Sequence, residues 1–197
     1  MSKDGTTVKK KAAPKEGGRQ APSAQARQAI VSSAHLVSER AAELSSFEYG
    51  LYVASNAFER WIVRCMAAAG QPELGALDVM VVHSVNHRAR DKRLADICFV
   101  LNIEDSHTVN YALKKLSRLG LVAGEKRGKE IFYATTKEGE ALCLKYREVR
   151  EACLVNSFSA FAGSQGEDLN EQIGQAADLL RALSGLYDQA ARAATSL

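Results

Sequence analysis

Residues 104–136 read EDSHTVNYALKKLSRLGLVAGEKRGKEIFYATT, and this stretch decides the fold. Its first half predicts an amphipathic helix, because its apolar residues recur at the spacing that buries one helix face. These residues are Val109, Ala112, Leu113, Leu116 and Leu119. The other face offers hydrogen-bond donors and partners for phosphate, namely Ser106, His107, Asn110, Tyr111, Lys114 and Lys115. Such a helix, with one hidden face and one polar face, suits a groove of DNA.

The second half of the stretch predicts a hairpin. Residues 121–124 and 131–135 have strand character, and Gly128 permits a tight reversal in the basic turn GEKRGKE between them. Asp105 or Ser106 can cap the helix before the hairpin. Thr136 can cap a further helix that runs from residue 137 to about residue 161.

Long helices are predicted on both sides. Residues 33–69 contain no proline and carry a broad apolar stripe, and Gly70 and Pro72 end it. Such a helix would be about 50 Å long, more than a small domain needs for its own core. The last helix carries an apolar seam at alternating spacings of four and three, formed by Leu169, Ile173, Ala176, Leu180, Leu183, Tyr187 and Ala190. The same chain could cover this seam, but two seams together favour a dimer.

Two shorter helices are predicted over residues 74–87 and 94–101, joined by a charged connector at 88–93. The second helix has four apolar residues in succession, 97–100, which predicts that it lies deep between its neighbours. Asn102 marks the turn that follows it.

Positive charge is local in this chain, whose net charge is only +3. Residues 1–32 hold seven Lys and Arg against two acids, and they predict a disordered basic tail that either attracts DNA or aids solubility. Residues 107–129 hold six bases and one acid. A local cationic patch favours a polyanionic partner, although a solvated helix face beside a charged hairpin tip would have the same composition.

Several other classes of function lack support. We find no run of eighteen apolar residues and no secretory signal, so we expect a cytoplasmic protein. There is no glycine-rich phosphate loop, nucleophile elbow or facing carboxylate pair, so we expect neither an enzyme nor a cofactor.

His83 and His87 are four residues apart, but no further ligand completes a metal site. Cys65, Cys98, Cys143 and Cys153 form no Cys-x-x-Cys pair and are expected to be buried thiols, with redox sensing as an alternative.

The order of these elements resembles the multiple-antibiotic-resistance-regulator (MarR) family of transcription factors over about residues 33–195. The resemblance rests on Leu94-Ala95, Thr108-Val109-Asn110, Leu113, Leu116, Gly120-Leu121-Val122, Thr136 and Gly139. The turn between the two central helices lacks a glycine, and Glu125-x-Arg127 stands where the family has Asp-x-Arg.

The resemblance implies a mainly α (α+β) fold, a winged helix-turn-helix with long N- and C-terminal dimerisation helices. We expect a tail at residues 1–32, a dimerisation helix at 33–73, a DNA-binding lobe at 74–140 and dimerisation helices at 141–197. The expected function is a homodimeric repressor or activator, most simply a repressor, that binds a pseudo-palindromic operator and is released by an aromatic or phenolic effector. A winged helix that binds protein instead of DNA is the alternative.

Residues for both sites follow from this interpretation. The expected DNA contacts are Ser106, His107, Thr108, Asn110, Tyr111, Lys114, Lys115, Arg127 and Lys129. The expected effector contacts are Tyr49, Tyr52, Phe58, Trp61 and His83, a set that core or dimer packing would explain equally well.

Overall fold

The structure, a computed structural model, describes residues 30–31, 33–162 and 168–197. Apart from residues 30 and 31, the predicted basic tail lies outside the described residues. The chain divides into two compact units, Met1–Tyr52 and Val53–Leu197. Within the described ranges, no helix is both long enough and apolar enough to cross a membrane.

The first unit contains a 3-10 turn, Ala34–Leu36, and the beginning of helix α1, Ala42–Ala68. The prediction of one helix from residue 33 is therefore wrong in its first turns. The hydroxyl of Ser45 donates to the carbonyl oxygen of Leu36 at 2.8 Å and accepts from the amide of Ser38 at 3.2 Å. These side-chain bonds satisfy backbone groups outside a helix, so the chain folds back before α1 begins.

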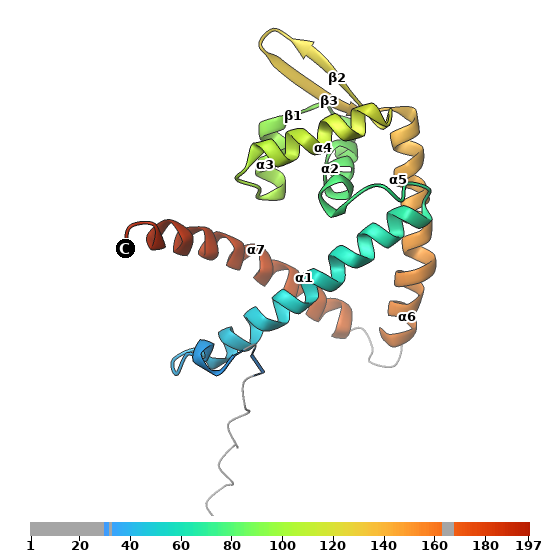
Figure 1. Ribbon diagram of the computed structural model, residues 1–197. Coiled ribbons are helices and arrows are strands. Elements are labelled where there is room, and N and C mark those ends of the chain that lie inside the picture. Colours follow the sequence, from blue (N-terminus) through green and yellow to red (C-terminus); the bar gives the residue numbers. More distant parts are fainter. Residues whose placement is uncertain (1–29, 32, 163–167) are drawn as a thin grey trace, which may run out of the picture. The chain divides into compact units, whose positions relative to one another are not determined.

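The second unit holds the rest of α1 and all later elements. They are α2 (Ala76–Asn86), β1 (Lys92–Arg93), α3 (Leu94–Leu101), α4 (Ser106–Arg118), β2 (Val122–Arg127), β3 (Glu130–Thr135), α5 (Lys137–Arg150), α6 (Asn156–Ala162) and α7 (Asp168–Ala194). Helices α2, α3 and α4 gather below the hairpin β2–β3, which projects beyond them (Figure 1). The fold is the predicted one, mainly helical with a small sheet.

The sheet has three antiparallel strands in the order β1-β3-β2. Its hairpin is longer than the sequence suggested, because both strands continue through the basic residues to a turn at Gly128, whose φ is 65°. The third strand, β1, pairs Lys92 with Tyr133 and Arg93 with Phe132, and it was not predicted. A strand of two charged residues has no apolar alternation that could reveal it.

The core lies beneath α4. The predicted inner face of this helix is confirmed, since Val109, Ala112, Leu113 and Leu116 are buried almost completely. They pack in one cluster with side chains from α1, α2, α3 and α5. This packing fixes which face of α4 points away from the protein.

The prediction that helix α3 lies deep between its neighbours is wrong. Ile97 is fully buried, but Phe99 is 86% exposed and Val100 is 65% exposed. The run of apolar residues suggested deep burial, yet a short helix that is apolar all round can turn only one face to the core. Asn102 ends α3 in the left-handed conformation, with φ of 52°, and so takes the place of the missing glycine.

Helix α5 begins as predicted, since the Thr136 hydroxyl accepts a hydrogen bond from the Gly139 amide at 3.1 Å. The helical path continues to Ala162, but a π-helical segment, Glu151–Val155, separates α5 from α6. The last helix, α7, contains the whole of its predicted seam, and Ile173, Leu180 and Leu186 on it are exposed.

Candidate nucleic-acid interface

Helix α4 offers a polar face that its own cap holds in place. The carboxylate of Asp105 accepts from the amide of His107 at 2.9 Å, and the Thr108 hydroxyl donates to the Asp105 carbonyl at 2.8 Å. The side chains that point outward include Ser106, His107, Thr108, Tyr111 and Lys114, whereas Asn110 is half-buried. Most of the predicted helix contacts therefore lie on one accessible surface.

Lys115 is the exception among the predicted contacts. Its ammonium donates to the Asp78 carboxylate and to the carbonyl oxygen of Glu73, each at 2.6 Å. The same carboxylate accepts from the amide of Gly75 at 2.9 Å. Lys115 therefore ties α4 to the start of α2, and its ammonium is engaged within the protein in this arrangement.

We expect Lys115→Met to lower the free energy of unfolding by about 1–3 kcal/mol, because it leaves the shielded Asp78 carboxylate without its cation. Denaturant titration measures this change. Lys114→Met, on the exposed side of the same helix, is the matched control and should change stability by less than about 0.5 kcal/mol. Equal stability of the two variants, with equal losses of DNA affinity, would return Lys115 to the DNA contacts.

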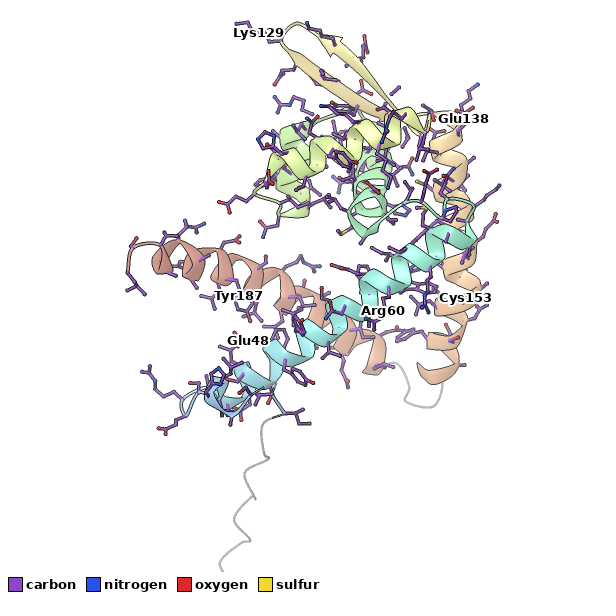
Figure 2. All side chains as sticks on the ribbon, in the orientation of Figure 1. Glu48, Arg60, Lys129, Glu138, Cys153 and Tyr187 are labelled. Carbon is purple, nitrogen blue, oxygen red and sulfur yellow. The ribbon has the colours of Figure 1, made fainter. Side chains whose placement is uncertain are left out.

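The hairpin carries exposed cations at its far end. Figure 2 shows Lys129 at the tip, where the strands reverse. Arg127 is held lower down by the Asp91 carboxylate at 2.6 Å and by Glu125. Its guanidinium also lies 5.0 Å from the centre of the Phe132 ring. Glu125 thus orients Arg127, while Lys129 extends outward.

Sequence reasoning missed three residues that belong to this surface. Arg118 on α4 and Lys126 on β2 are exposed cations on the elements that carry the predicted contacts. Their membership of the basic segment 107–129 was the signal that could have selected them. Asp91 had no such signal, because its role depends on Arg127, which is distant in the sequence.

A cavity of about 600 Å³ lies within the second unit, between α1, α2, α3, α5 and the segment that follows α2. Of the five predicted effector residues, Phe58 and His83 line it. The lining also includes Ile62, Val79, Met80, Ser84, His87, Arg88, Arg90, Lys92, Val100, Leu101 and Tyr146. The walls are mostly apolar, and the lining includes three basic side chains, Arg88, Arg90 and Lys92.

The other three predicted effector residues do not line this cavity. Phe58 and Ile62 are four residues apart and share one face of α1, whereas Trp61 is half-buried and does not line the cavity. Tyr49 and Tyr52 belong to the first unit, and Tyr52 is exposed. Aromatic composition alone could not distinguish these faces.

His83 is a half-buried polar group of the cavity lining. Its ring packs edge-on against Tyr146, with 4.5 Å between ring centres, and Nε2 is buried without a hydrogen-bond partner among the described residues. Burial lowers the pKa of His83, so the ring is neutral at physiological pH. A neutral imidazole can donate to or accept from a small molecule. No group of three or more His, Cys, Asp or Glu side chains in the described chain is arranged to hold a metal ion.

The cysteines differ in exposure. Cys65 and Cys143 are buried and Cys98 is half-buried, but Cys153 is exposed on the π-helical segment, so the expectation that all four are buried is wrong. Burial raises the pKa of Cys143 to about 11 and also raises the pKa values of Cys65 and Cys98. These three thiols are therefore poor candidates for redox sensing, which requires a thiolate.

Comparisons with known proteins agree with this geometry. Residues 74–139 match the family described as winged helix DNA-binding domain. Among solved structures, a MarR-family transcriptional regulator from Rhodococcus sp. RHA1 has a TM-score of 0.53 at 13% identity, covering 64% of this chain and 86% of that one. NadR in complex with 4-hydroxyphenylacetate has a TM-score of 0.53 at 20% identity, with 68% and 89% covered. The transcriptional regulator BldR from Sulfolobus solfataricus has a TM-score of 0.51 at 16% identity, with 73% and 97% covered. A search of curated proteins gave no significant match.

Proposed function

We propose that this chain, which carries a winged-helix DNA-binding domain and has the fold of MarR-family transcriptional regulators, is a sequence-specific regulator of transcription. The observation that carries the proposal is the placement of α4. Its apolar face is fixed in the core, and its opposite face presents hydrogen-bond donors next to a hairpin with a cationic tip. The comparisons support a DNA-binding regulator rather than an enzyme.

In the proposed complex, α4 enters the major groove, where each base pair shows a distinct pattern of donors and acceptors. Residues near its N-terminus lie deepest in the groove. Asn110 can bond to adenine through both polar atoms of its amide, and His107 and Tyr111 lie on the accessible surface beside it. Ser106 and Thr108 lie where the helix N-terminus attracts a phosphate. Arg127 and Lys129 follow the backbone or enter the adjacent minor groove.

Two substitutions separate base reading from phosphate binding. Asn110→Ala should cost about 1–3 kcal/mol at one base position and relax the preference there. Lys129→Ala should weaken binding to all sequences alike, because a contact from the hairpin tip to phosphate carries no base information. Competition binding against single-base variants of the DNA upstream of the protein's own gene measures the affinity and the base preference of each variant. If the two variants show the same pattern across these sequences, the assigned roles are wrong.

We propose that the functional unit is a homodimer on a pseudo-palindromic site. Helices α1 and α7 are 27 residues long each, and both expose large apolar side chains. Among these are Leu51 and Phe58 on α1 and Ile173 and Leu186 on α7. Segments 33–73 and 141–197 are thus the proposed dimerisation elements, and 74–140 is the proposed reading head. Two-fold symmetry would place two copies of α4 in successive major grooves.

We further propose that the regulator is a cytoplasmic repressor released by a small aromatic molecule bound in the cavity of the second unit. Apolar walls, one unpartnered imidazole and three basic side chains fit a ligand with an aromatic ring and an anionic or phenolic group. NadR, whose structure contains 4-hydroxyphenylacetate, shares the fold.

4-Hydroxyphenylacetate provides a direct test. We expect it to raise the melting temperature of the protein, and we expect His83→Phe to bind it roughly tenfold more weakly through the loss of one buried hydrogen bond. Tyr52→Ala, an exposed position outside the cavity lining, is the control and should retain the shift. A shift of equal size in His83→Phe, or no shift in any protein, would contradict this effector assignment.

A further inference from the structure

The segment 87–93 follows α2 and includes β1. It contacts both the cavity and the hairpin β2–β3, which is the wing of the winged helix. It begins with a 3-10 turn, His87–Ala89, in which Arg88 has φ of 63°, and it ends in β1, paired with β3. Arg88, Arg90 and Lys92 line the cavity. Residues Asp91 and Arg93 between and after them bond to the hairpin strands instead.

These wing contacts are ion pairs. The Asp91 carboxylate lies 2.6 Å from the Arg127 guanidinium on β2, and Arg93 lies 3.1 Å from the Glu130 carboxylate on β3. Successive side chains of an extended segment point to opposite sides. The alternation therefore gives this short segment one side that faces the cavity and one side that holds the wing.

Lys92 maintains the shape of the segment. It is buried, and its ammonium donates to three backbone carbonyl oxygens, those of Val85 at 2.9 Å, Arg90 at 3.2 Å and His87. These carbonyls lie at the end of α2 and in the turn after it, where the helix supplies no partners. Lys92 is also one of the residues that line the cavity, which places its side chain next to any molecule bound there.

We propose that segment 87–93 transmits occupancy of the cavity to the wing: an anion in the cavity draws the Lys92 ammonium from the carbonyl oxygens of Val85, His87 and Arg90, and the released segment shifts β1 and the Asp91–Arg127 ion pair. The proposal rests on the proposed function for its consequence, which is weaker DNA binding. Lys92 is a positioning residue in this scheme, because it acts on the wing through the segment.

The chemistry of the competing partners supports this exchange. When an ammonium donates to a carboxylate both partners carry charge, so this hydrogen bond is stronger than the one that a neutral carbonyl oxygen accepts from the same ammonium. Burial lowers the pKa of Lys92, so a nearby anion would compensate a charge that the protein solvates only partly. A ligand changes a conformational equilibrium only by binding the two states differently, and Lys92 provides that difference here.

The coupling can be tested by placing the anion in the cavity genetically. Val100→Glu introduces a carboxylate at an exposed lining position, and Val100→Gln is the neutral control of the same shape. Hydrogen exchange of the backbone amides of the hairpin, residues 122–135, is measured without DNA, and exchange of α4 serves as the internal reference. We expect roughly tenfold faster exchange of the hairpin in the Glu variant than in the Gln variant.

Five further variants make the outcome specific. Asp91→Asn should remove most of the difference between the Glu and Gln proteins, because it disconnects the segment from Arg127. Leu144→Glu and Leu144→Gln, at an exposed apolar position on α5 outside this cavity, should exchange alike. If Val100→Glu does not fold, His87→Glu and His87→Gln repeat the comparison at a second exposed lining position.

Equal hairpin exchange in folded Glu and Gln proteins would overturn the coupling, and so would a difference that persists unchanged with Asp91→Asn. DNA affinity is measured separately. A hairpin that responds to the carboxylate in a protein that binds no DNA would keep the coupling and reject the proposed function. A DNA-binding protein whose hairpin does not respond would keep the function and reject the coupling.

Discussion

Gly139→Ala should destabilise the second unit by about 1–3 kcal/mol or more, although it adds a single methyl group. A Cβ at Gly139 would meet the carbonyl oxygen of Leu121 at less than van der Waals distance. That carbonyl accepts from the Thr136 amide at 3.1 Å, and the Thr136 hydroxyl donates to the Gly120 carbonyl at 2.6 Å. The backbone therefore has little freedom to move aside.

Thermal unfolding of the purified protein measures this effect, at roughly 2–4 °C for each kcal/mol in a chain of this size. Gly174→Ala on α7 is the matched control, because its added methyl group would meet nothing within 4 Å. A helix interior favours alanine over glycine, so the control should be neutral or slightly stabilising. If the two variants melt alike, the close approach of α5 to the end of α4 does not constrain the fold as we describe.

The sequence predicted those features of the fold that depend on local patterns. The spacing of Val109, Leu113 and Leu116 was enough to identify the buried face of α4, because helix periodicity is a property of neighbouring residues. The cap at Thr136 and the turn at Gly128 were found for the same reason, and the cap of α4 was narrowed to Asp105 or Ser106, of which the structure has Asp105. Each of these signals lies within a few residues of the structure that it determines.

Features that depend on distant partners could not be predicted in this way. Lys115 is a basic residue on the polar side of α4 and was therefore predicted to contact DNA. In the structure its ammonium bonds to the Asp78 carboxylate on α2 and to the Glu73 carbonyl oxygen in the loop before α2. Arg127 is likewise held by Asp91 across the sheet. The cavity draws its lining from α1, α2, α3, α5 and segment 87–93, so no local pattern could separate Phe58, which lines it, from Trp61, which does not.

Steep salt dependence is the largest effect that the proposed function predicts. The accessible cations on α4 and the hairpin include Lys114, Arg118, Lys126 and Lys129, and a dimer would present two sets of them. Each contact with a DNA phosphate releases condensed counterions, so affinity falls linearly in a plot of log K against log salt concentration. With six to ten phosphate contacts, affinity should fall roughly 10³–10⁵-fold between 50 and 200 mM salt.

The most direct measurement is therefore the affinity of the full chain for the DNA upstream of its own gene across that salt range, with a scrambled duplex of equal length as control. We expect the upstream DNA to be bound more tightly than the scrambled duplex at every salt concentration, with steep slopes for both. DNA binding that is absent or insensitive to salt would contradict the account. If the same protein still binds a partner protein, the result would favour a winged helix used for protein recognition.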